Sequence, residues 1–190
     1  MTQRAKNIVE PLNARVADAA RAAQIMHGLD GMLADLEQLI RTLPVSAYCA
    51  TRAGESSIGA HVRHVVEFMQ MLADHVDSGV VDYENRKRNI VYETDPRAVA
   101  AMLPPLRATL AHVLTHYGTA HALELRETTL AGGEKLSFST SLGREMLFML
   151  QHGVHHLAII KMQAAAMNIA LGSQFGVAVA TQAYREQVNG

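Results

Sequence analysis

The segment that decides the fold of this chain is residues 140–168, TSLGREMLFMLQHGVHHLAIIKMQAAAMN. It contains no proline, and it opens at Thr140 or Ser141, either of which can cap a helix. One set of side chains recurs every three or four residues and therefore shares a helix face: Leu142, Glu145, Met149, His152, His156, Ile160, Gln163 and Met167. At about 1.5 Å per residue, the segment spans roughly 40 Å. The pattern predicts a long bundle helix that directs two histidines into the core.

These two histidines, His152 and His156, are four residues apart, so their imidazoles lie one turn apart on the same side of the helix. Two imidazoles at this spacing can bind one metal ion. A second pair, His61 and His64, lies on an earlier segment in phase with Phe68, Met71 and His75. If the pairs converge, a third nitrogen completes a three-histidine site with open positions for water or substrate.

The alternative is a purely structural role for these histidines. A lone inward histidine is more often a hydrogen-bonded core residue than a metal ligand. Several imidazoles without partners would each cost about 1–3 kcal/mol in an apolar core, and one shared metal ion would satisfy them together. His112 and His116 have the same spacing but fall off the apolar face of their segment, so we expect them to be surface residues.

Three further segments are predicted to be helices. Residues 14–43 end before Pro44, residues 56–77 start at Ser56 or Ser57, and residues 95–117 open with Asp95 and Pro96. Pro104 and Pro105 imply a kink in the last of these, or a later start. Residues 121–128 and 134–140 alternate polar and apolar side chains around a Gly-Gly pair, which predicts a small β-hairpin or extended excursion.

These elements predict an all-α fold, a four-helix bundle with at least one long crossover connection and a small β-hairpin or extended excursion between the third and fourth helices. We expect a single domain over residues 1–190, with irregular chain in roughly residues 1–12 and 173–190.

Composition narrows the classes of protein. The 17 basic and 18 acidic residues nearly cancel and form no basic stripe, so no nucleic-acid partner is expected. No apolar run approaches the roughly 20 residues needed to cross a bilayer, so no membrane partner is expected. Residues 1–21 lack the apolar core of a secretory signal, and the one cysteine cannot form an internal disulfide. A cytoplasmic protein is therefore expected.

Two motifs together resemble the DinB/YfiT-like (damage-inducible-B-like) metalloenzyme superfamily. The first is SIGAHVRH at residues 57–64, and the second is SLGRE at residues 141–145 followed by HGVHH at residues 152–156. The resemblance spans roughly residues 30–167, and the order and spacing of its segments fit the family. It implies a bundle of up-down-down-up topology. It also implies a three-histidine site for a divalent ion, usually zinc, nickel or iron.

Carried over residue by residue, the resemblance implies His64, His152 and His156 as the metal ligands. His61 and His155 are then neighbours of the ligands, as hydrogen-bond partners or proton carriers, although either could replace a predicted ligand. The resemblance further implies an enzyme acting on a small molecule, either a metal-dependent hydrolase or a transferase that uses a low-molecular-weight thiol.

Several other side chains are candidates for the site. Glu145, with His61 and His155, is a candidate catalytic residue, although an anchoring role or an ion pair with Arg63 or Arg144 is favoured for Glu145. Glu67 is expected to face solvent. Residues 82–88, DYENRKR, are expected to form a solvated loop, with binding of an anionic substrate group as the alternative.

The rival function is a non-catalytic metal-binding or dimerising bundle, such as a stress protein. A homodimer is expected, and in this reading its interface consists of Leu147, Leu150, Val154 and Leu157. An open cavity beside the histidines, lined by Phe68, Met71 and Met149, would favour the enzyme. Imidazoles hydrogen-bonded to one another in a filled core would favour the rival.

Overall fold

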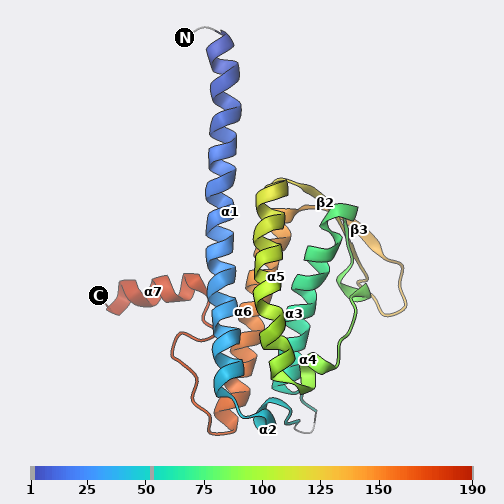
Figure 1. The fold of residues 1–190 in the computed structure, drawn as a ribbon, viewed down its shortest axis with the longest axis vertical. Helices are drawn as coiled ribbons and strands as arrows, with labels where there is room; N and C mark the ends of the chain where they lie inside the picture. The colour runs from blue at the N-terminus through green and yellow to red at the C-terminus, as the bar shows by residue number, and fades with distance from the viewer. Residues whose placement is uncertain (1–2, 52–53, 190) are drawn as a thin grey trace.

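Four long helices build the structure, a computed structural model that describes residues 3–51 and 54–189. They are α1 (Gln3–Thr42), α3 (Ile58–His75), α5 (Pro96–Tyr117) and α6 (Leu142–Ala166). Helix α1 packs against α5 and α6, and α3 packs against the same two helices (Figure 1). The predicted helical fold is confirmed, and α3 and α6, which carry the two histidine motifs, are in direct contact.

Local signals in the sequence fix where the helices begin. The side chain of Ser57 accepts a hydrogen bond from the backbone N–H of Ala60, and Ser141 does the same for Arg144. Helix α5 begins at Pro96 after the cap Asp95, and it continues through Pro104 and Pro105. A later start of this helix, one of the two alternatives, is therefore wrong.

A three-stranded sheet flanks one end of the helices. Strands β2 (Ala122–Glu127) and β3 (Leu136–Ser141) pair antiparallel, which confirms the predicted hairpin. Strand β1 (Val80–Val81) pairs in parallel with β2, and this third strand was not predicted because two residues carry no periodicity. The strict all-α class is corrected accordingly.

The chain between β1 and α5 contains two short elements, the 3-10 turn η2 (Tyr83–Asn85) and α4 (Val91–Thr94). A further short helix, α2 (Val45–Tyr48), follows α1. Both connections pack onto α3: the Tyr48 hydroxyl donates to the backbone carbonyl of Tyr92 at 2.6 Å, in the buried layer between α2 and α4. These connections therefore lie against α3, the helix that carries the first histidine motif.

Helices occupy much of both terminal regions in which irregular chain was expected, although residues 173–178 contain no helix. Helix α1 starts at Gln3, and α7 occupies Val179–Asn189 (Figure 1). No residue from 13 to 28 is buried, and the core contribution of α1 starts at Leu29. Helix propensity, with many Ala, Arg and Gln residues, sustains these ends without the apolar periodicity on which the boundaries were predicted.

The core is a continuous cluster of aliphatic and Met side chains from all four long helices. Helix α5 is long and apolar enough to cross a membrane by composition alone. Its apolar residues Leu103, Leu106 and Leu110 are buried against the other helices.

A close approach at Gly59 fixes α4 against α3. A Cβ at Gly59 would overlap the carbonyl oxygen of Glu93 and lie 2.6 Å from Cε1 of Tyr48, whereas a Cβ at Gly31 on α1 would meet nothing within 4 Å. We expect Gly59→Ala to lower the free energy of unfolding by about 1–3 kcal/mol, because a backbone carbonyl would have to shift. Gly31→Ala should raise it by about 0.5–1 kcal/mol through helix propensity. Urea unfolding of both variants measures the two changes; equal effects of the same sign would contradict this packing.

Candidate metal centre

Three histidines converge where α3 contacts α6. One nitrogen each from His64, His152 and His156 lies within 4.8 Å of the other two, and all three side chains are partly buried. The closest pair is Nε2 of His64 and Nε2 of His152, 2.8 Å apart. The three residues are those that the sequence motifs indicated as ligands.

The remaining histidines of the two motifs lie at the edge of this cluster. Nδ1 of His61 is 2.9 Å from Nδ1 of His156, so His61 is a hydrogen-bond partner of one member. His155 is exposed, and its ring is 5.7 Å from that of His156. His112 and His116 stack on one another at the surface of α5, which confirms that this pair is not inward.

Burial keeps the cluster uncharged. Burial first, and the neighbouring imidazoles second, lower the pKa of His64 to about 4 and that of His156 to about 3. Burial also lowers the pKa of His61 and of His152. All four rings are therefore neutral near pH 7, and each carries one unprotonated ring nitrogen, the atom type that accepts a proton, a hydrogen bond or a metal ion.

The donor set fits a divalent transition metal. Ligand nitrogens about 2.0–2.1 Å from a tetrahedral zinc ion lie about 3.4 Å from one another. The nitrogens of this cluster, 2.8 Å apart at the closest and 4.8 Å at the most, bracket that spacing. Neutral imidazoles suit zinc, nickel and iron, and they leave the charge of the ion available for chemistry.

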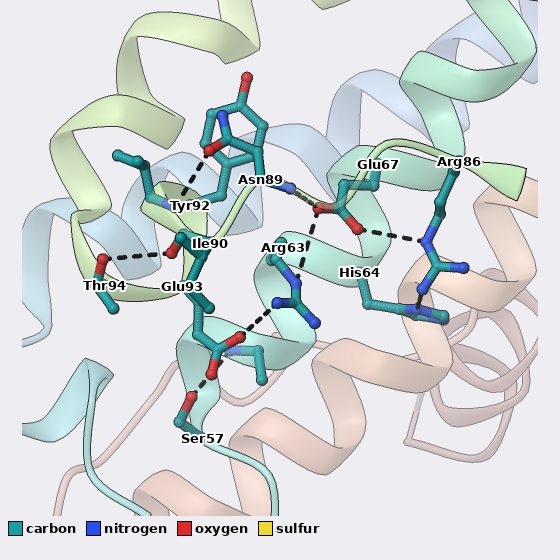
Figure 2. A network of polar contacts seen from close by, with 12 residues as sticks. Ser57, Arg63, His64, Glu67, Arg86, Asn89, Ile90, Tyr92, Glu93 and Thr94 are labelled. Atoms are coloured by element: carbon teal, nitrogen blue, oxygen red, sulfur yellow. Dashed lines mark hydrogen bonds and ion pairs between the residues drawn. The ribbon is translucent and has the colours of Figure 1, made fainter.

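A buried carboxylate, Glu67, is linked to His64 through the side chain of Arg86. Glu67, one turn further along α3, is 2% exposed, and its oxygens accept from Nε of Arg86 at 3.3 Å and from the backbone N–H of Asn89 at 2.6 Å (Figure 2). Nη2 of Arg86 in turn lies 3.2 Å from Nδ1 of His64. The expectation that Glu67 faces solvent is wrong, because Arg86 and Asn89, distant in sequence, cover it.

A second buried carboxylate, Glu145, lies on α6. It accepts from the Tyr83 hydroxyl at 2.8 Å and from Oγ1 of Thr140 at 2.6 Å. Among the described residues it forms no ion pair with Arg63 or Arg144, so that alternative is wrong, and an anchoring role stays a prediction. Residues 82–88 are only partly the solvated loop that was expected: Glu84, Asn85, Lys87 and Arg88 are exposed, but Tyr83 is buried and Arg86 nearly so.

Aromatic rings hold His152 in place and border a pocket. Phe68 stacks on His152 and on Tyr83, with ring centroids 4.9 and 4.8 Å apart, and Phe148 stacks on His152 at 5.3 Å. The same three aromatic residues line a pocket of about 190 Å³, together with Leu125, three arginines and three glutamates: Arg86, Arg126, Arg144, Glu84, Glu127 and Glu145. Met149 is buried in the core and Met71 lines a different pocket, so only Phe68 of the three expected lining residues borders this one.

Residues 29–160 match the DinB superfamily, well over half of the chain and including both histidine motifs. The resemblance predicted from those motifs is confirmed. FK506-binding protein 5 of Rhizopus delemar is 29% identical over 103 residues, which cover 54% of this chain and 26% of that protein. The chain therefore matches about a quarter of the relative's length. No solved structure matches this chain.

The buried neutral imidazoles predict a stability that falls with acid in metal-free protein. Unfolded histidines take up protons near pH 6.5, whereas folded His64 resists protonation down to about pH 4. Between these values the unfolded state binds more protons, so the free energy of unfolding falls by about 1.4 kcal/mol per pH unit for each such imidazole.

Urea unfolding at pH 7.5, 6 and 5 in the presence of a chelator measures this slope. His64→Gln should make the slope shallower, and His112→Gln, outside the cluster, should leave it as in wild type. A His64→Gln protein with the wild-type slope would refute the conclusion that burial of neutral His64 makes stability fall with acid.

Proposed function

Because this chain belongs to the DinB superfamily, we propose that it is a metal-dependent enzyme in which His64, His152 and His156 hold one divalent ion. The observation that carries the proposal is the convergence of three neutral imidazoles from two helices at one point. Zinc or nickel suits this donor set best, and iron is also compatible. We further propose that the four long helices follow the up-down-down-up topology that the family resemblance implies.

The ion would supply Lewis-acid chemistry, which activates water or a thiol for attack on a small molecule. Hydrolysis and thiol transfer are the two reaction classes that this chemistry supports. His61, neutral and next to His156, is placed to accept a proton released in the reaction. Glu145 has both oxygens engaged by Tyr83 and Thr140, so its role is to hold the wall of the pocket.

The proposed partner is a small-molecule substrate, with a low-molecular-weight thiol as one candidate, rather than nucleic acid or a membrane. The near balance of basic and acidic residues supports a small-molecule partner. We also propose a cytoplasmic location, because the one cysteine cannot form an internal disulfide. The match to FK506-binding protein 5 covers too little of that protein for the binding in its name to be carried over.

The second candidate is a non-catalytic bundle, and one observation favours it: the imidazoles pair with one another at 2.8 and 2.9 Å. The interface proposed for its homodimer receives less support. Leu157 is fully buried, and Leu150 and Val154 pack against the core. Of the four expected interface residues only Leu147 is exposed, at 41%.

Metal content distinguishes the two candidates. Protein purified without an affinity tag, supplied with zinc or nickel and then dialysed, should contain about one ion per chain by mass spectrometry. His64→Ala, His152→Ala and His156→Ala should each lose the ion, because two imidazoles hold it too weakly. Zinc at a hundred times its Kd should raise the free energy of unfolding of wild type by about 2.7 kcal/mol.

His112→Ala and His116→Ala are the matched controls, since they remove the same chemical group at the same helical spacing on α5. Both should retain the ion, and circular dichroism should report helical folds for all five variants. Wild type that stays free of metal after zinc and nickel are both supplied would reject the enzyme and leave the structural bundle.

A further inference from the structure

The polarity of one hydrogen bond conflicts with metal binding. A guanidinium has only donors, so Nδ1 of His64, 3.2 Å from Nη2 of Arg86, is the acceptor and carries no proton. A neutral His64 then carries its proton on Nε2, the atom 2.8 Å from Nε2 of His152. This is the tautomer that cannot ligate a metal through Nε2.

A ligating histidine normally donates its other N–H to an acceptor such as a carboxylate, which fixes the ligating tautomer. Here Arg86 occupies that place (Figure 2). If the proton of His64 moved to Nδ1, this N–H would face the N–H of Nη2 of Arg86, and neither group could accept the other's hydrogen. The Arg86 contact and ligation by Nε2 of a neutral His64 are therefore mutually exclusive.

The surroundings of Arg86 indicate where its freed donor would point. Nε is paired with Glu67, so this ion pair can keep the guanidinium in place while it turns to move Nη2 away from His64, at the expense of the 2.9 Å bond that Nη1 donates to the carbonyl of Tyr83. The side chain is only 11% exposed and lies over the ring of Phe68, at 4.8 Å, as part of the pocket lining. A buried donor without a partner is costly, and an anionic oxygen satisfies it best.

We propose that Arg86 is a two-position residue: it holds His64 in the non-ligating tautomer in metal-free protein, and on metal loading it presents Nη2 to an oxyanion of the substrate in the adjacent pocket. This inference rests on the proposed metal site. It names the substrate as a small molecule with a carboxylate, phosphate or similar anionic group. It also makes metal binding precede anion binding at this site.

Zinc affinity gives the first test, because removing Arg86 should strengthen zinc binding if Arg86 competes with the metal for His64 and weaken it if Arg86 supports the site. Arg86→Met and Arg86→Gln should bind zinc about 3- to 10-fold more tightly than wild type by calorimetry, since a competing hydrogen bond is gone. A supporting role for Arg86 gives the opposite result, a loss of about 10- to 100-fold. The glutamine can accept from Nδ1–H and guards against a methionine variant that misfolds.

Arg144→Met is the matched control, because it removes an equal charge from the same pocket without touching a histidine. It corrects for the general gain in cation affinity when a positive charge is lost. Equal tightening in Arg144→Met and Arg86→Met would overturn the proposal. Failure of wild type to bind zinc would instead reject the metal site, and the two failures are thus distinguishable.

Two direct readouts complete the test. Nitrogen-15 spectra of histidine-labelled protein, with His64→Ala for assignment, should show His64 protonated at Nε2 without metal and at Nδ1 with zinc. An Nδ1–H tautomer of His64 in metal-free protein would refute the proposal that Arg86 holds this residue in the non-ligating tautomer. Sulfate, as the oxyanion probe, should bind zinc-loaded wild type at least 5-fold more tightly than zinc-loaded Arg86→Met. Equal sulfate affinity of the two zinc-loaded proteins would indicate that the anion binds the metal alone. It would overturn the proposal that Nη2 of Arg86 contacts the anion.

Discussion

Contact between α3 and α6 imposes the constraint on which the site depends, because it brings four imidazoles into a space that water reaches poorly. Each ring loses hydration on burial and recovers part of the cost through a neighbouring ring, in the pairs His64–His152 and His61–His156. The same burial keeps the rings neutral at physiological pH. A cluster that is costly to bury without a partner is therefore also a set of available metal ligands.

Two buried carboxylates, one on each of these helices, attach the segment after β1 to the histidine cluster. Glu67 on α3 holds Arg86 and the backbone of Asn89, and Glu145 on α6 holds Tyr83. The charge on Glu67 is balanced by Arg63 and Arg86, whereas Glu145 is satisfied by hydroxyl donors. The segment thus closes one side of the site by polar contacts, and the ring of Phe68 contacts both Arg86 and His152.

Much of this arrangement could be predicted from the sequence, and the failures share a cause. The phase of His152 and His156 on α6 follows from periodicity alone, as does the exposure of His112 and His116. His61 and His64 both contact α6, and only the family resemblance indicated that His64 rather than His61 joins His152 and His156 in the three-histidine cluster. Glu67 was misplaced because its partners lie about twenty residues further along the chain, beyond any local pattern. The helical ends at α1 and α7 were missed because propensity, rather than a buried face, sustains them.

The turn η2 and its flanks have a consequence for chain length. Tyr83 and Arg86 are three residues apart, yet one is anchored to α6 and the other to α3. The three-residue spacing of these two anchors therefore has to match the distance between Glu145 on α6 and Glu67 on α3. An insertion or deletion of one residue between them would rotate one anchor away from its carboxylate, so this short segment should tolerate changes of side chain at Glu84 far better than changes of length. The hairpin tip near Gly132, which holds no such pair of anchors, is the place where the chain could lengthen freely.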